Sequence, residues 1–141
     1  MPQKTPQQTK KQKLRFSLVP GSFAVCRLAA NAAVPAWALR GEFFSVTRTS
    51  DELSIACAQE NVPSGTQAAG PWSCFKLLGP FAFELTGVLS SVLEPLAANG
   101  ISIFAISTYD TDYVLVREES AAAAIEALHN AGHELVTNLS G

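Results

Sequence analysis

Charged side chains are scarce in this sequence, and long apolar runs are missing. Lys, Arg, Asp and Glu make up 16% of the 141 residues, whereas hydrophobic residues make up 48%. The apolar runs end well short of the roughly 20 residues that cross a bilayer, so we expect no contact with a membrane. The length indicates one ordinary domain or two very small ones. The composition indicates either a surface with few charges or a surface that is hidden against a partner.

Basic residues are especially rare beyond the N-terminus. Residues 16–141 hold five basic and twelve acidic groups, a net charge of −7 with neutral histidines. Such an acidic body repels phosphate groups, which argues against binding to nucleic acid. The other five basic residues lie among the first fifteen positions, in a segment rich in Gln, Lys, Thr and Pro. We expect residues 1–13 to form a disordered basic tail.

Cysteine is also infrequent. Cys26, Cys57 and Cys74 are odd in number, and each lies in an apolar, strand-like context. This pattern predicts buried free thiols in a reducing compartment. The N-terminal residues carry charge without a following apolar segment, so no secretory signal is expected. We therefore expect a cytoplasmic protein.

The residue sets that carry enzyme chemistry are missing as well. The sequence has neither a Gly-x-Ser-x-Gly motif nor a Gly-rich phosphate loop with lysine. Asp110 and Asp112 are two apart on an extended loop, where side chains point in different directions. His129 and His133 are separated by Gly132, which ends a helix, so we expect surface histidines rather than a metal site. No catalytic residue, metal or cofactor is predicted, and the chain is not expected to be an enzyme.

The first half of the chain reads as four strands and a short helix. Alternating apolar residues predict strands over 14–19 and 23–28, with a turn at Pro20-Gly21 between them. A short Ala-rich helix is expected within 29–39, and strands over 43–49 and 53–58. Residues 61–71 hold two prolines and two glycines and are interpreted as a linker. We place the domain boundary there, with one unit over 14–66 and another over 67–141.

The second half has a clearer pattern. Strands are predicted over 72–78, 101–107, 113–117 and 134–139. Apolar residues from Leu85 to Leu96 recur at helical spacing, and a second helix follows residue 120. The order strand–helix–strand–strand–helix–strand indicates an α+β, ferredoxin-like fold with both helices on one face of the sheet. Because the strand over 101–107 is apolar on both sides, its other face must be covered by the first half, a second chain or both.

Two polar loops of this second half are expected at the same end of the sheet. Residues 84–87 lead into the first helix, whose free backbone N–H groups attract a carboxylate. Residues 108–112 join the two middle strands and include Asp110 and Asp112. These acids, with Glu84, could bind a cationic group, so that the two loops together suit a free amino acid. Thr and Asp are equally typical of a simple hairpin turn, and that alternative stays open.

Three segments of the second half resemble the ACT domain: residues 79–89 with the motif ELTGVL, residues 96–104, and the run STYDTDYVLV at 107–116. Within the ACT family, the sequence most resembles small bacterial proteins with two ACT units in tandem, which are related to the cytosolic arginine sensors of animals. The resemblance implies two ferredoxin-like βαββαβ ACT units, the first one reduced. It also implies a non-catalytic regulatory protein that binds a small effector, such as an amino acid, at an ACT–ACT interface. A homodimer would restore the four units of the sensors. The alternative is a ligand-free interaction or oligomerisation module.

The residues expected to bind the ligand follow from this resemblance and from the two loops. Glu84 and Asp112 would face a cationic group of the ligand. The complete predicted set is Glu84, Leu85, Thr86, Gly87, Val88, Ser107, Thr108, Tyr109, Thr111 and Asp112.

Overall fold

The computed structural model describes residues 13–79 and 87–137. Most of the expected tail, and Glu84, Leu85 and Thr86 of the expected site, lie outside the described residues. The described strands are β1 Arg15–Leu28, β2 Ser45–Arg48, β3 Leu53–Ala58, β4 Ala68–Leu77, β5 Ile103–Ser107, β6 Asp112–Arg117 and β7 Glu134–Leu135. The helices are α2 Val88–Ala98 and α3 Ala121–Asn130, with 3₁₀ turns η1 Ala36–Leu39, η2 Gln59–Asn61 and η3 Glu118–Ser120.

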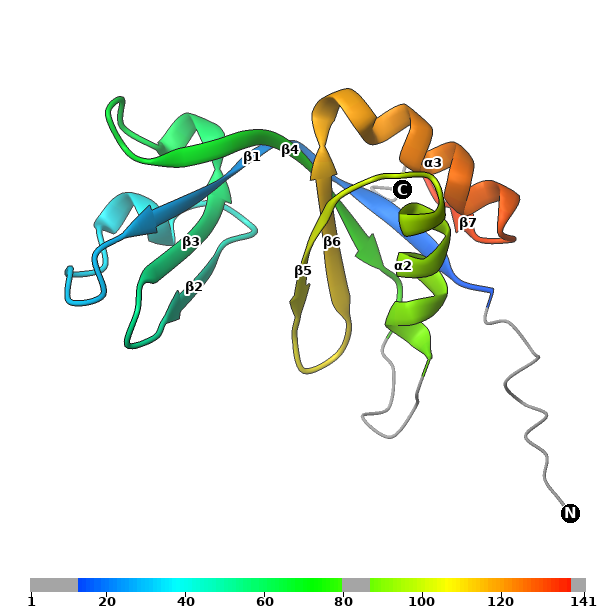
Figure 1. The fold of residues 1–141 in the computed structure, drawn as a ribbon, viewed down its shortest axis with the longest axis horizontal. Coiled ribbons are helices and arrows are strands. Elements are labelled where there is room, and N and C mark those ends of the chain that lie inside the picture. The colour runs from blue at the N-terminus through cyan, green and yellow to red at the C-terminus, as the bar shows by residue number, and fades with distance from the viewer. Residues whose placement is uncertain (1–12, 80–86, 138–141) are drawn as a thin grey trace, which may run out of the picture.

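A single sheet joins both halves of the described chain (Figure 1). Its order is β2-β3-β1-β4-β6-β5, and β7 pairs in parallel with the start of β1. The long strands β1 and β4 run through both halves. The C-terminal part of β1 pairs with β3, and its N-terminal part pairs with β7. β4 pairs with β1 along its length and with β6 from Trp72 onward. The strands therefore make one curled, mostly antiparallel sheet rather than two separate ones.

The predicted turn at Pro20-Gly21 is wrong, because β1 continues through it as one strand. The pairing of β1 with β4 shifts register between Val19 and Phe23. Gly21 has a φ of +99°, a conformation that glycine adopts without the penalty of a Cβ. Pro20 and Gly21 thus mark an irregularity in a continuous strand, a place where proline and glycine are tolerated.

The predicted linker over 61–71 is shorter in the structure, because β4 begins at Ala68. Ala68 and Ala69 pair with Cys26 and Val25 of β1. Pro71 is tolerated there because β6 joins β4 only from Trp72 onward, so this part of the strand is an edge. The division into units over 14–66 and 67–141 stays a prediction, but β1 contributes to the sheet on both sides of it.

The second half has the predicted ferredoxin-like arrangement, with α2 and α3 on the same face of the sheet (Figure 1). Val92, Leu96 and Leu128 from the two helices pack on Leu77 and Val114 from the strands. The helix α2 ends in a turn in which the Ile101 N–H donates to the Leu96 carbonyl, and Gly100 has a φ of +72°. This is the glycine stop that the sequence predicts.

One strand of this sheet comes from the N-terminal end of the chain. The start of β1 lies between β4 and β7, so that the last strand pairs with β1 instead of β4. Leu14 and Phe16 from this segment are buried in the core beneath the two helices, and the Phe16 ring meets Phe75 edge to face at 5.6 Å. The C-terminal unit therefore needs residues 14–19 to complete its own core.

The face of the sheet away from the helices is partly covered by the first half, as one of the predicted alternatives required. Cys74 and Leu115 lie on this face and are fully buried. Phe43, from the segment before β2, stacks on Tyr113 with ring centroids 4.7 Å apart and meets Phe23 at 5.6 Å. These three rings join the two halves across the open side of the sheet.

His133 is buried, with 2% of its surface exposed, and it connects three segments. The Leu14 N–H donates to His133 Nδ1 over 3.0 Å, so the ring proton lies on Nε2. Nε2 donates to the Ser91 carbonyl, 2.8 Å away. That carbonyl lacks its usual helical donor, because Pro95, four residues later, has no N–H. The prediction of a surface position is confirmed for the exposed His129 and is wrong for His133.

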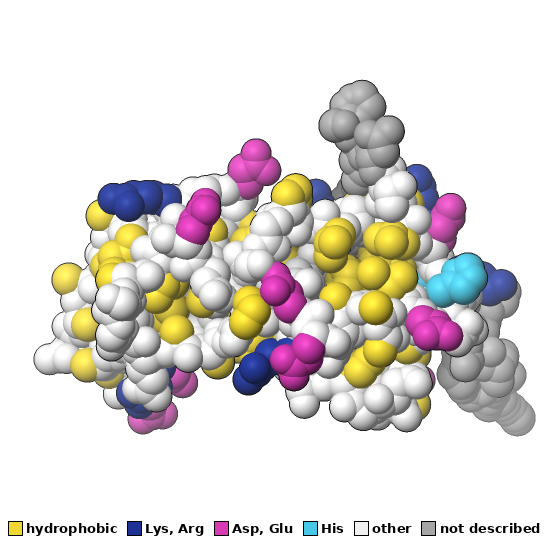
Figure 2. All heavy atoms as spheres, turned by 90° about the horizontal axis from the view of Figure 1, so that it is seen from above, with side chains coloured by type: hydrophobic (Ala, Val, Ile, Leu, Met, Phe, Trp, Pro, Cys, Tyr) yellow, Lys and Arg dark blue, Asp and Glu magenta, His cyan; other side chains and the backbone are white. Residues whose placement is uncertain are grey.

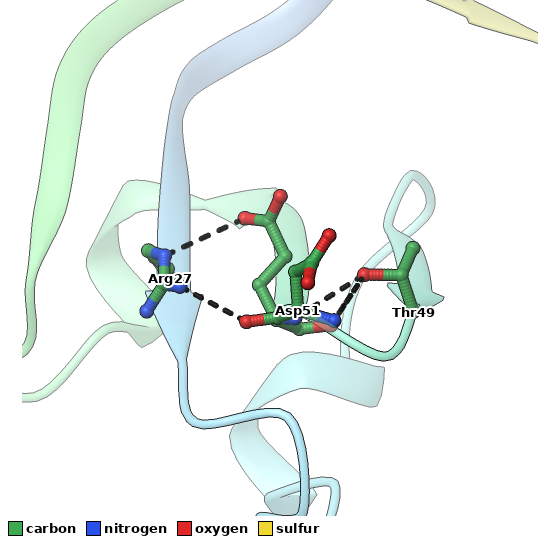
Figure 3. Close-up of polar contacts among 4 residues, drawn as sticks. Arg27, Thr49 and Asp51 are labelled. Carbon is green, nitrogen blue, oxygen red and sulfur yellow. Dashed lines mark hydrogen bonds and ion pairs between the residues drawn. The ribbon is translucent and has the colours of Figure 1, made fainter.

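The turn between β2 and β3 uses polar groups structurally (Figure 3). Thr49 Oγ1 accepts from the backbone N–H groups of Asp51 and Glu52 at 3.0 and 3.2 Å. Arg27 on β1 donates to the Asp51 carbonyl over 3.0 Å and forms a 3.8 Å ion pair with Glu52. Both charged side chains are about half exposed, so the pair adds little to stability.

The three cysteines are buried free thiols, as predicted. Burial raises the pKa of each above the ordinary 9.0. The pKa of Cys57 rises to about 11, first through burial and then through the neighbouring Cys26. Burial raises that of Cys74 to about 12. Since the thiolate is the reactive form, these thiols are shielded both by position and by protonation.

We expect an aromatic disulfide reagent to modify fewer than one thiol per folded chain at neutral pH, and all three after unfolding in guanidinium. Rapid labelling of the folded protein would contradict the buried placement.

The raised pKa values of the thiols also predict that stability depends on pH. Above pH 9.0 the unfolded chain loses thiol protons that the folded chain keeps until about pH 11 for Cys57 and about pH 12 for Cys74. The free energy of unfolding should therefore fall as the pH rises through this window.

Candidate functional site

The loop between β5 and β6 is a tight turn closed by its own side chains. The Thr108 N–H donates to the Thr111 carbonyl over 2.7 Å, and the Thr108 hydroxyl donates to the same oxygen over 3.0 Å. The Thr111 N–H in turn donates to Thr108 Oγ1 over 3.2 Å. Beyond the turn, the Ser107 hydroxyl donates to an Asp112 carboxylate oxygen, which joins the two strand ends. Tyr109, at the tip, is 79% exposed.

Thr111 fixes this loop to the end of β4. It is a buried polar residue with 8% of its surface exposed, and its hydroxyl donates to the Leu77 carbonyl over 2.6 Å. β4 leads, through residues 80–86, into α2. The hydroxyls of Thr108 and Thr111 therefore have structural roles, while their part in ligand binding stays a prediction.

The start of α2 offers backbone donors. Gly87 has a φ of +85° and occupies the position before the helix, where no described side chain forms a capping hydrogen bond. Its carbonyl accepts from the Ser91 N–H at 3.0 Å and from the Ser90 hydroxyl at 3.3 Å. The free N–H groups of the first turn carry the positive end of the helix dipole. Val88 packs into the core with 5% exposure, so it contributes backbone rather than side chain.

The start of α2 at Gly87 and the 107–112 turn lie at the same end of the sheet (Figure 1). The bond between Thr111 and Leu77 anchors this turn beside the end of β4. Among the described residues, no hydrogen bond joins Gly87 or Val88 to Ser107, Thr108, Thr111 or Asp112. The described geometry thus supplies a helix N-terminus and the carboxylate of Asp112 without a direct contact between them.

A cavity that sequence reasoning missed lies on the opposite face of the sheet. It has a volume of about 590 Å³ and is lined by residues of both halves, among them Glu42, Phe43, Lys76 and Tyr113. The signal in the sequence is Lys76, a single charge within the otherwise apolar strand around Cys74 to Leu78. A smaller hollow of about 250 Å³ lies between the edge strand β5 and the β2–β3 hairpin.

Other kinds of site find no support in the described part of the chain. It holds no group of three or more His, Cys, Asp or Glu residues placed to bind a metal. None of its helices is long and apolar enough to cross a membrane. On the face shown in Figure 2, basic and acidic side chains occur in small separate groups, so this face presents no broad basic surface for nucleic acid.

The fold is an α+β unit with two helices over a curled, mostly antiparallel sheet. The family model of the ACT domain matches residues 67–130, and a second model, of an N-terminal domain, matches residues 21–65. Residues 67–130 therefore belong to the ACT domain family.

Solved structures and curated relatives agree with this family. A crystal structure of a protein from Agrobacterium tumefaciens is 46% identical, with a TM-score of 0.85 over 89% of this chain and 93% of that one. The regulatory subunit of aspartate kinase from Thermus flavus, 15% identical with a TM-score of 0.57 over 86% of this chain and 97% of that one, shares the fold. The human cytosolic arginine sensor for mTORC1, subunit 1, is 30% identical over 100 residues. That match covers 63% of this chain but only 30% of the length of the sensor.

Proposed function

We propose that this chain is a non-catalytic regulatory protein that binds an amino acid at an interface between ACT units. The observation that carries the proposal is the start of α2, which no described side chain caps and which lies at the same end of the sheet as Asp112. The helix N-terminus suits the ligand carboxylate, and the Asp112 carboxylate suits a cationic group. The relationship to a protein named as an arginine sensor supports this ligand class.

The binding residues in this proposal are those of segments 84–88 and 107–112. The turn that fixes Asp112 is already formed through Ser107, Thr108 and Thr111. Such a preformed turn lowers the ordering cost of binding. We further propose that the protein acts in the cytoplasm, since the human relative is named a cytosolic sensor. We also propose a homodimer, which would bring together four ACT-like units.

Calorimetry of the full chain against each of the twenty amino acids tests the proposal. We expect heat, and a matching rise in Tm, with at least one ligand that carries a cationic side chain. A binding ligand stabilises the folded state by mass action, so the two signals should agree. If no amino acid gives either signal at millimolar concentration, the proposed function is wrong.

A second candidate is a ligand-free module that assembles chains. The observation in its favour is that the 108–111 turn satisfies its own hydrogen bonds without a ligand. Light scattering separates the two candidates. A stable oligomer whose mass and Tm do not respond to any amino acid would favour the assembly role.

A further inference from the structure

The missed cavity lies on the far side of the sheet from the helices and from Asp112. In β4, Phe75 and Leu77 face the helices, so the alternation of a strand turns Cys74 and Lys76 the other way. In β6, the same alternation turns Asp112 and Tyr113 to opposite faces. The cavity and the proposed amino-acid site are therefore separate.

Three polar side chains lie in a row across the floor of this cavity. Ser17 of β1, Lys76 of β4 and Tyr113 of β6 are directly paired neighbours in the sheet. Ser17 is 7% exposed and Lys76 is half-buried. Burial, with a further contribution from Cys74, raises the pKa of the Tyr113 hydroxyl above its ordinary 10.0, so that it remains a donor at neutral pH. The row offers an ammonium group between two hydroxyls.

The walls of the cavity are largely apolar. Phe43 lies against Tyr113 at 4.7 Å, and Val19 and Leu135 also line the space. Glu42, next to Phe43, brings a single exposed carboxylate to the same cavity. A volume of about 590 Å³ is typical of cavities that hold small molecules.

Although Glu42 lines the same cavity, Lys76 forms no close ion pair among the described residues. The ion pair found there joins Arg27 and Glu52, at the other end of the sheet. A half-buried ammonium group beside apolar walls has lost part of its hydration, which costs free energy. An anionic partner offsets this cost through charge-assisted hydrogen bonds. Glu42 disfavours a second negative charge on that partner.

We propose that this cavity binds a small monocarboxylate with an apolar body, its carboxylate on Lys76 and its body against Phe43 and Val19. The Ser17 and Tyr113 hydroxyls can donate to the same carboxylate. An amino group is not required for recognition, in contrast to the site near Asp112. Dicarboxylates are disfavoured by Glu42, and amines by Lys76.

Phenylacetate is the probe for this site, with phenethylamine as the matched cation. We expect calorimetry of the full chain to show millimolar or tighter binding of phenylacetate and none of the amine. Lys76→Met keeps the length and apolar stem of the side chain and should weaken binding by at least about 10-fold, the loss of a charge-assisted hydrogen bond. Lys76→Arg should stay within about 3-fold of the wild type, because it keeps the charge. Urea unfolding checks that each variant is folded.

Asp112→Asn separates this site from the proposed function. It should leave phenylacetate affinity unchanged, while Lys76→Met should leave amino-acid affinity unchanged, so either proposal can fail alone. Amide chemical shifts should move at Ser17, Phe43 and Tyr113 when phenylacetate is added. The proposal is wrong if phenylacetate does not bind, if Lys76→Met binds it as tightly as the wild type, or if Asp112→Asn abolishes binding.

Discussion

Replacing His133 with leucine should lower the free energy of unfolding by about 2–4 kcal/mol. Leucine fills a similar space, but it leaves the Leu14 N–H and the Ser91 carbonyl without the bonds of 3.0 and 2.8 Å that the imidazole makes. Each buried polar group without a partner costs roughly 1–3 kcal/mol. Urea unfolding monitored by tryptophan fluorescence measures the change, and His129→Leu, at an exposed position, should change stability by less than about 0.5 kcal/mol.

A double-mutant cycle with Pro95→Ala tests the reason for this loss. Alanine at position 95 restores an N–H that can donate to the Ser91 carbonyl within α2. The cost of His133→Leu should then be smaller by about 1 kcal/mol, the worth of one hydrogen bond. If the cost is the same in both backgrounds, the bond from His133 to Ser91 does not contribute to stability.

Replacing Asp112 with alanine should weaken binding of a cationic amino acid by about 1.5–3 kcal/mol, or roughly 10- to 150-fold in Kd. The carboxylate would lose its charged hydrogen bond to the ligand, and Ser107 would lose its acceptor. Arginine, the ligand named for the human relative, is the first probe for calorimetry.

Two control variants separate charge from loop structure. Asp112→Asn keeps an oxygen that can accept from Ser107, so a loss as large as that of the alanine variant identifies the charge as the cause. Asp51→Asn removes the same charge in the β2–β3 turn and should leave binding unchanged. An unchanged Kd in Asp112→Ala would remove this residue from the site.

Local sequence patterns predicted the strand–helix order of the second half well, because the pattern there is repeated and regular. The apolar spacing up to Leu96 and the glycine at position 100 are enough to define the course and end of α2. The strand β3 likewise matches its predicted range at Leu53–Ala58. The start of α2 and the 107–112 turn fall at one end of the sheet because a βαββαβ order leaves no other place for them.

The errors of prediction all concern residues whose surroundings lie far away in the chain. Pro20-Gly21 looks like a turn from its own chemistry, but partners on β4 hold it in a strand. His133 looks exposed because it follows a helix end, yet Leu14 and Ser91 enclose it. Local propensity is a weak preference, and tertiary pairing overrides it.

The sequence by itself determined the ACT resemblance of the second half, the order of its strands and helices, and the acidic composition that argues against nucleic acid. These features depend on short-range periodicity and on composition, which a single chain displays directly. Only the tertiary structure decided that β1 completes the core of the C-terminal unit and that Lys76, Glu42 and Phe43 line one cavity. Such juxtapositions join residues distant in the sequence, and the packing of the sheet, rather than any local pattern, brings them together.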